Sequence, residues 1–194
     1  MSFPQVTLEL PGWVEEFLPD PRGTYPTEED RMRLVVELSR LNVERGTGGP
    51  FGAAIFERET GRLLAPGVNL VVPASCSVAH AEMVAIMIAQ QVAGDFDLGG
   101  GGKPAYALYA STEPCAMCLG ATPWSGVRGL SCGARDEDAR AVGFDEGAKL
   151  PDWIAALEEI GISVKRDVLR EDAARVLFDY SNGGGEIYNA RRGD

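Results

Sequence analysis

Two short segments of the chain carry residue types that could bind a metal ion and activate water. His80 and Glu82 are separated by one residue, and Pro114 is followed by Cys115 and Cys118. Imidazole nitrogen and thiolate sulfur are ligands that zinc prefers, and a catalytic zinc site keeps three protein ligands and one position for water. His80, Cys115 and Cys118 therefore form the predicted ligand set. Glu82 lies close enough in sequence to exchange a proton with the metal-bound water.

The two cysteines are three residues apart, so both sulfurs point the same way in the first turn of a helix. A helix N-terminus favours anions, which lowers a thiol pKa and suits thiolate ligands. Two alternatives are a core histidine beside buried cysteines and a redox Cys-x-x-Cys pair. His80 is the only histidine in the 194 residues, and its place in a His-x-Glu segment favours the zinc interpretation.

These two segments belong to a set of motifs that are spread over most of the chain, from about residue 31 to residue 188. They occupy residues 49–54, 69, 80–82, 113–118, 124–127, 143–147 and 187–189. The first four resemble motifs of the cytidine-deaminase-like superfamily, and the last three resemble those of its bacterial guanine deaminases. The resemblance implies a zinc-dependent hydrolytic deamination, in which guanine would give xanthine and ammonia. Aminotriazines such as ammeline present a similar amidine edge and are further candidate substrates.

The resemblance also suggests which residues contact the substrate. Asn69 ends an apolar strand, and its amide could read the edge of a base; the alternative is an Asx turn. The ring of Phe51 is expected to stack on the base, although a plain core phenylalanine is nearly as good an interpretation. Ala81, Trp124 and Tyr188 complete the expected substrate contacts. Relatives of this type form homodimers and close the site with C-terminal residues.

A second acid is expected in the loop at residues 143–147. The guanine branch carries an acidic residue there that serves as a proton carrier for the leaving amine, and Glu146 matches it. Asp145 is the substitute candidate. The alternative for both is a surface acid in a chain that is acidic throughout.

The charge of the chain argues against a nucleic-acid substrate. There are 29 acidic and 18 basic residues, a net charge of −11. Because nucleic-acid binders neutralise phosphates with Lys and Arg, this balance favours a small neutral base as the partner. It disfavours a tRNA adenosine deaminase, which would share the metal ligands.

Two other interpretations stay open. A cytosine or nucleoside deaminase would also share the metal ligands. A structural zinc module, which is not an enzyme, would need a fourth protein ligand from Cys76 or Cys132. Otherwise both cysteines are expected to be buried free thiols, with Cys76 near the site.

The chain is expected to form a single deaminase domain over residues 1–194, with an irregular N-terminal arm at 1–26 and a C-terminal tail at 182–194. Strands alternating with helices predict a three-layer α/β/α sandwich around a mixed sheet of about five strands. The expected strands are 51–56, 63–72, 106–111, 127–133 and 163–168. The expected helices begin after Thr27, at His80, at Cys115 and at residues 135, 153 and 171.

Cellular location is predicted from what the sequence lacks. No apolar run approaches the ~20 residues that cross a bilayer, and the N-terminus does not resemble a signal peptide. Four cysteines without a secretory signal argue against a disulfide framework. We therefore expect a cytoplasmic protein without a membrane partner.

Overall fold

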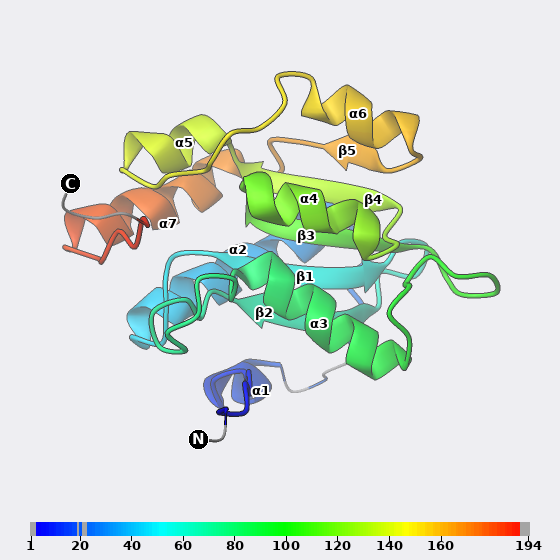
Figure 1. Ribbon diagram of the computed structural model, residues 1–194, viewed down its shortest axis with the longest axis horizontal. Coiled ribbons are helices and arrows are strands. Elements are labelled where there is room, and N and C mark those ends of the chain that lie inside the picture. Colours follow the sequence, from blue (N-terminus) through cyan, green and yellow to red (C-terminus); the bar gives the residue numbers. More distant parts are fainter. Residues whose placement is uncertain (1–2, 19, 21–22, 191–194) are drawn as a thin grey trace.

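A five-stranded sheet forms the centre of the computed structural model, which describes residues 3–18, 20 and 23–190 (Figure 1). The strand order is β2-β1-β3-β4-β5. β1 pairs antiparallel with β2 and β3, whereas β4 pairs parallel with β3 and β5, so the sheet is mixed as predicted. The strands are β1 Gly52–Glu57, β2 Leu63–Val68, β3 Tyr106–Thr112, β4 Gly129–Ala134 and β5 Ser163–Lys165.

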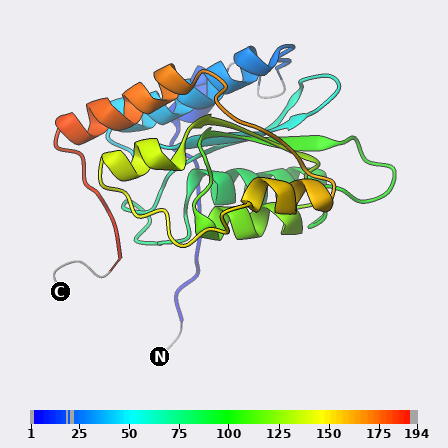
Figure 2. The ribbon, with the colours of Figure 1, turned by 90° about the horizontal axis from the view of Figure 1, so that it is seen from above.

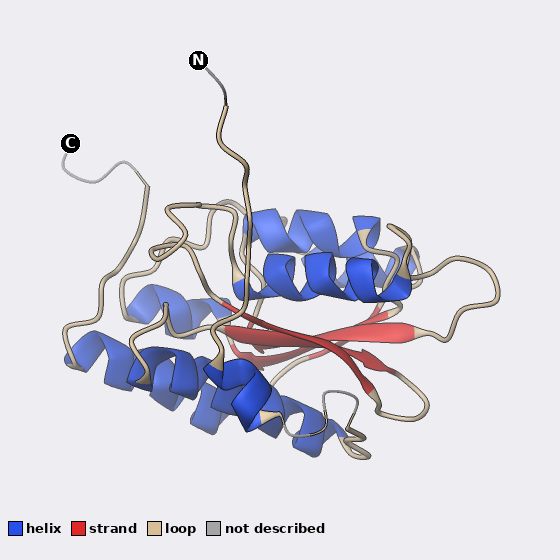
Figure 3. Cartoon of the chain, turned by 90° about the horizontal axis from the view of Figure 1, so that it is seen from below, coloured by secondary structure: helices blue, strands red, loops and turns tan. Residues whose placement is uncertain are grey.

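Helices cover both faces of this sheet, which confirms the predicted three layers (Figure 3). One face carries α3 (Ala81–Ala93), α4 (Ala116–Trp124) and α6 (Trp153–Glu159). The other face carries α1 (Trp13–Phe17), α2 (Glu28–Glu44) and α7 (Arg170–Asn182), with α5 (Asp136–Ala141) at its edge. Alternate residues of β1 enter the two cores, because successive side chains of a strand point to opposite faces.

The start of α2 shows how local sequence sets an element boundary. The Thr27 side chain accepts a hydrogen bond from the Asp30 backbone nitrogen at 3.0 Å, and the Thr27 backbone nitrogen donates to the Asp30 carboxylate at 3.2 Å. This capping box satisfies backbone donors that have no partner inside the helix. The apolar stripe that follows buries Met32, Val35 and Leu38 completely.

A glycine brings α3 close to the sheet and so places the start of that helix. A Cβ added at Gly67 in β2 would lie 2.3 Å from the Ala81 carbonyl oxygen and 2.6 Å from the Ala85 nitrogen. Only glycine permits this approach of strand and helix backbones. The residues at the beginning of α3, including His80 and Glu82, are thereby held against the end of the sheet.

The N-terminal arm is not wholly irregular, contrary to the prediction. Residues 13–17 form α1, whose Trp13 indole nitrogen donates to the Thr47 hydroxyl at 2.9 Å. Val14 and Leu18 are buried in the core beside α2. So short a helix is marginal alone and depends on tertiary packing, which sequence periodicity does not report. Residues 1–2, 19 and 21–22 of the arm and 191–194 of the tail lie outside the described residues.

Two strands end earlier than predicted. β2 stops at Val68 because residues 70–76 form turns, in which Ala74 donates to the Leu70 carbonyl and Ser75 has a positive φ of 49°. β5 stops at Lys165, and Asp167 has a φ of 64°. A left-handed residue cannot continue an extended strand.

The tail folds back on the molecule after α7. Figure 2 shows this segment leaving the end of α7 and running toward the loop that follows α5. Among the described residues, no helix combines the length and apolar character required to span a membrane.

Candidate metal centre and active site

Two helix N-termini converge on the predicted metal ligands. His80 is the N-cap residue of α3, Cys115 is the N-cap of α4, and Cys118 lies in the first turn of α4. The donor atoms of these three residues all lie within 4.8 Å of one another. The His80 Nδ1 and Cys115 Sγ atoms are 3.5 Å apart.

This donor set fits a zinc ion. With zinc–nitrogen and zinc–sulfur distances of ~2.0 and ~2.3 Å, tetrahedral ligand atoms stand about 3.5–3.8 Å apart. The His80–Cys115 separation of 3.5 Å lies in that range. Within the described part of the chain, no fourth Cys, His or acidic ligand joins this group. Three protein ligands leave one coordination position for water, as a catalytic site requires.

The surroundings of the cysteines favour a thiolate. A hydrogen bond from the Cys118 thiol, together with the His80 ring, lowers the pKa of Cys115 to about 4. The same interaction raises the pKa of Cys118, which is fully buried. Burial, followed by the negative charge of Cys115, raises the pKa of Glu82 above its usual range. Burial therefore makes the Glu82 carboxylate a stronger proton acceptor than an exposed one.

Glu146 enters the same cavity from a different part of the chain. The cavity has a volume of 360 Å³ and is lined by His80, Glu82, Cys115 and Glu146, among others. Glu146 is only 6% exposed, and its backbone oxygen accepts a hydrogen bond from the Ala116 nitrogen at 2.9 Å. Burial, together with the nearby charge of Cys115, raises its pKa to about 8. Two buried carboxyl groups thus share one cavity with the metal ligands.

Asp145 also borders the cavity, but its carboxylate has other partners. It is exposed, and its Oδ1 atom accepts a hydrogen bond from the Gly147 nitrogen at 2.9 Å. The same atom lies 3.9 Å from Arg140 Nη1. Of the two acids considered from the sequence, Glu146 is therefore the buried one that shares its surroundings with the metal ligands.

Aromatic rings and the C-terminal tail close the other side of the cavity. The Phe144 ring packs edge-on against Phe51, with centroids 4.9 Å apart, and against Tyr188 at 5.3 Å. Phe51, Tyr188 and Asn189 all line the cavity. The Tyr188 hydroxyl is buried and has no hydrogen-bond partner among the described residues. The tail of this chain therefore lies over the site of the same chain.

Asn69 makes the Asx-turn contact that was considered for it, and its substrate contact stays a prediction. Its Oδ1 atom accepts a hydrogen bond from the Val71 nitrogen at 3.2 Å, which is the Asx-turn contact. Its Nδ2 atom is buried and has no partner among the described residues. Val71 and Phe51 line the cavity, and the Asn69 nitrogen donates to the Phe51 carbonyl at 3.1 Å. Asn69 itself is not among the residues that line the cavity, so its unpartnered amide lies beside the lining.

Two other expected contacts lie elsewhere. Ala81 is buried as the first residue of α3 and does not line the cavity. Trp124 is 86% exposed at the C-terminal end of α4, the opposite end of the helix from Cys115. The structure does not bring Trp124 to the cavity, because the helix that starts at the metal carries it away.

Several residues that line the cavity, Thr112 and Phe144 among them, were not predicted to do so. Thr112 is the last residue of β3, and its buried hydroxyl has no partner among the described residues. Alternation along β3 places it on the same face as Leu108, so the pattern contained this signal. Phe144 lies in an irregular loop, and no periodicity points to it. Cys76 and Cys132 are free and lie outside the cavity lining, Cys132 being fully buried.

Comparisons with known proteins agree with this geometry. Residues 26–134 match the model of the cytidine and deoxycytidylate deaminase zinc-binding region. The guanine deaminase of Bacillus subtilis is 38% identical over 118 residues, which are 61% of this chain and 71% of that protein. A tRNA-specific adenosine deaminase of Buchnera aphidicola is 28% identical over 149 residues, 77% of this chain and 90% of that protein.

A solved structure extends the likeness to nearly the whole chain. The guanine deaminase from Nitrosomonas europaea superposes with a TM-score of 0.87 at 42% identity. The match covers 93% of this chain and 100% of the other. It therefore extends well beyond residues 26–134, which the family model matches.

Proposed function

Because the chain belongs to the cytidine and deoxycytidylate deaminase zinc-binding family, we propose that it is a guanine deaminase that forms xanthine and ammonia. Membership confirms the predicted class, a zinc-dependent hydrolytic deaminase. The choice of guanine is the further step. Ammeline, whose amidine edge is similar, is a second candidate substrate.

One observation carries this choice. Glu146 is buried in the same cavity as Glu82 and the metal ligands, although it comes from a loop outside the shared zinc-binding region. The amine of guanine leaves from a carbon that is flanked by two ring nitrogens. One carboxyl group can then serve a ring nitrogen while the other serves the departing amine.

The roles of the two acids follow from the proton balance. When zinc is bound by His80, Cys115 and Cys118, it supplies an activated water for the attack. Glu82 accepts the proton from that water on a carboxylate oxygen and delivers it to a ring nitrogen. Glu146 delivers a proton to the exocyclic amine, which leaves as ammonia when its bond to the ring carbon breaks. The added hydroxyl group gives its proton to the Glu146 carboxylate as the carbonyl of xanthine forms, which restores the acid for the next turnover. Guanine and water are thereby converted to xanthine and ammonia without a further reactant.

Base recognition is assigned to the residues around the cavity. The free amide donors of Asn69 would bond acceptors on the base, and the Phe51 ring would cover its face. The Tyr188 hydroxyl, which is buried without a described partner, would bond the substrate from the tail. A buried polar group without a partner is costly, so a bound base that satisfies these groups gains affinity.

We also infer a cytoplasmic homodimer built from single domains of residues 1–194. Trp124 and Phe96 are 86% and 81% exposed, and the Leu98 nitrogen donates to the Ser125 carbonyl beside them. An exposed apolar patch of this kind supports an interface with a second copy through the end of α4. The absence of a disulfide among the four cysteines agrees with a reducing compartment.

The test is ammonia release from a panel of guanine, ammeline, cytosine, adenine, guanosine and tRNA, with zinc content measured on the same preparation. We expect turnover of guanine, loss of activity on chelation and recovery with added zinc. If tRNA is turned over best, the chain is a tRNA adenosine deaminase instead. If cytosine or guanosine is turned over best, it is a cytosine or nucleoside deaminase. Zinc without ammonia release from any compound would indicate a structural metal site.

A further inference from the structure

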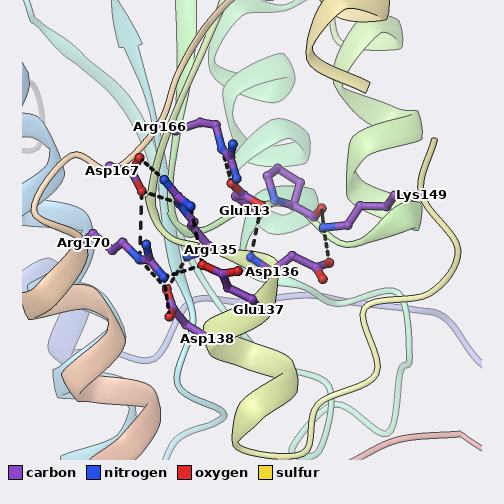
Figure 4. A network of polar contacts seen from close by, with 10 residues as sticks. Glu113, Arg135, Asp136, Glu137, Asp138, Lys149, Arg166, Asp167 and Arg170 are labelled. Atoms are coloured by element: carbon purple, nitrogen blue, oxygen red, sulfur yellow. Dashed lines mark hydrogen bonds and ion pairs between the residues drawn. The ribbon is translucent and has the colours of Figure 1, made fainter. Parts of the chain in front are cut away.

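A cluster of charged side chains lies around the beginning of α5 (Figure 4). Its centre is Asp136, the first residue of α5. The Asp136 carboxylate has two cationic partners. Its Oδ1 atom lies 2.5 Å from Lys149 Nζ, and its Oδ2 atom accepts a hydrogen bond from Arg140 Nε at 2.5 Å. Asp136 therefore holds two cations on one carboxylate.

Each of these cations also bonds a backbone carbonyl beside a residue of the site. Lys149 Nζ donates to the Pro114 carbonyl at 3.0 Å, immediately before Cys115. Arg140 Nη2 donates to the Gly147 carbonyl at 2.7 Å, immediately after Glu146. We call Lys149, Asp136 and Arg140 the bridge. Lys149 connects Asp136 to the turn of Cys115, and Arg140 connects Asp136 to the loop of Glu146.

The two backbones at the ends of this bridge also touch directly. The Ala116 nitrogen donates to the Glu146 carbonyl at 2.9 Å, and a Cβ added at Gly147 would lie 3.0 Å from the Ala116 Cβ. This is the direct backbone hydrogen bond between the two segments, and the bonds from Asn189 to Asp145 and Gly143 tie the loop to the tail and not to the Cys115 turn. Two further attachments through Asp136 join the two segments and hold Glu146 at one distance from Cys115.

We propose that Asp136 is a positioning residue that sets the place of Glu146 relative to the Cys115 turn. This inference rests on the proposed function, in which Glu146 moves a proton. Without the carboxylate, Lys149 and Arg140 lose their shared counterion and face each other as like charges. The carbonyls of Pro114 and Gly147 then lose their fixed spacing, and a misplacement of about 1 Å can lower a rate about 100-fold.

A role in stability alone would not account for this arrangement. The side chains of Arg140, Asp136 and Lys149 are 43%, 22% and 9% exposed. The Arg140 side chain is largely accessible to solvent, so its pair with Asp136 contributes at most about 1 kcal/mol. The bridge connects two backbone segments that border the cavity, so its main consequence is on the distance between Glu146 and the Cys115 turn.

The first experiment compares Asp136→Asn with Asp167→Asn. Asparagine keeps the shape of the side chain and the backbone bond from the Asp136 nitrogen to Glu113, at 3.1 Å. Asp167 belongs to the same cluster, where Arg135 Nε donates to it at 2.7 Å, but it touches neither carbonyl. We expect Asp136→Asn to lower kcat for guanine ten- to a hundredfold with KM changed less than threefold, and Asp167→Asn to change kcat less than twofold.

Two further measurements report on the positioning itself. Hydrogen exchange of the Ala116 amide and of segment 143–147 should quicken at least tenfold in Asp136→Asn and stay unchanged in Asp167→Asn. Zinc content should remain one per chain in both. Unchanged exchange, or loss of zinc from Asp136→Asn, would overturn the proposal, because the residue would then serve something other than the Glu146 loop.

A double-mutant cycle separates positioning from general damage. If Asp136 acts only through Glu146, then Asp136→Asn should lower kcat less than twofold in a Glu146→Gln background. If the two substitutions instead lower kcat by the product of their separate factors, the two residues act independently and the proposal is overturned. If the unaltered enzyme does not turn over guanine, the proposed function fails instead, while the exchange measurement still tests the bridge.

Discussion

The two walls of the cavity are built in different ways. The wall with the zinc ligands belongs to the shared family region, and its residues stand at the N-termini of α3 and α4. The wall with Glu146 and Tyr188 comes from residues after 134 and consists of a loop and a tail. Helix and sheet hydrogen bonds hold the first wall, whereas the second wall is held by the backbone bond from Ala116 to Glu146, by aromatic packing and by side-chain contacts.

We relate this difference to two tasks. The first wall carries the metal-dependent chemistry that relatives share, and the second wall is proposed to select the base. A metal site needs ligand atoms at fixed distances, and helix termini on a packed sheet supply them. A base-selecting wall must differ among relatives that share the metal ligands, and loops can change without disturbing the sheet. The variants below each act on one wall and should leave the other intact.

The largest effect is expected at the zinc wall, from Glu82→Gln. The amide cannot accept the proton of the attacking water, so guanine turnover should fall about 1,000-fold. Because Glu82 is not a ligand in this assignment, zinc content should stay at one per chain by elemental analysis. A variant that keeps a tenth of the activity would contradict the assignment of this acid.

The second largest effect is expected across the cavity, from Glu146→Gln. Loss of the proton donor to the leaving amine should lower kcat about 100-fold, again with zinc retained. Asp145→Asn is the matched comparison and should lower kcat less than tenfold, since its oxygen can still accept the Gly147 hydrogen bond. The opposite ranking in steady-state assays would make Asp145 the second acid.

Removal of the tail tests how far the second wall depends on it. Truncation after Ser181 removes Tyr188 and also Asn189, whose side chain bonds the Asp145 nitrogen at 2.9 Å and the Gly143 carbonyl at 2.8 Å. We expect KM for guanine to rise at least tenfold while zinc binding persists. Equal kinetics of the truncated and intact enzymes would show that the tail has no part in the site.

A single hydroxyl gives a finer version of this test. Tyr188→Phe should raise KM about fivefold, which corresponds to about 1 kcal/mol for one lost hydrogen bond to the substrate. The melting temperature without substrate should be unchanged or higher, since the hydroxyl has no described partner in the folded chain. A lower melting temperature with unchanged KM would assign the hydroxyl to stability.

The smallest effect concerns the ion pairs behind the second wall. The hydrogen bond from Arg170 holds the pKa of Asp138 below its usual range. A lowered folded-state pKa adds stability above the unfolded pKa of about 4, and that stability is lost as the pH falls below it. Asp138→Asn should therefore lower the free energy of unfolding by about 0.5–1 kcal/mol at pH 7.

The pH dependence of this difference is the discriminating measurement. Urea unfolding of both proteins at pH 7 and pH 3 should show the gap narrowing at the lower pH, because Asp138 protonates in the unaltered chain. A gap of equal size at both values would show that the lost contact is not electrostatic.

The residues of the wall with the zinc ligands could be predicted from the sequence because they lie in two short segments with characteristic spacings. One residue separates His80 from Glu82, and the spacing of Cys115 and Cys118 matches one helical turn. The alternation of strands and helices likewise predicted three layers and a mixed sheet. Each helix and strand shows in the residue pattern of its own segment, and the order of these segments along the chain indicated the layers.

Tertiary structure decided what the second wall contains. Asn189 meets the loop of Glu146 across 44 and 46 residues of chain, and no periodicity encodes such a contact. Glu146 is buried and Asp145 is exposed, although the two acids are adjacent in sequence. The direction of α4 took Trp124 to the surface, where a motif had suggested a substrate contact. Residue types can name the candidates, but only packing in three dimensions determines which of them face the same cavity.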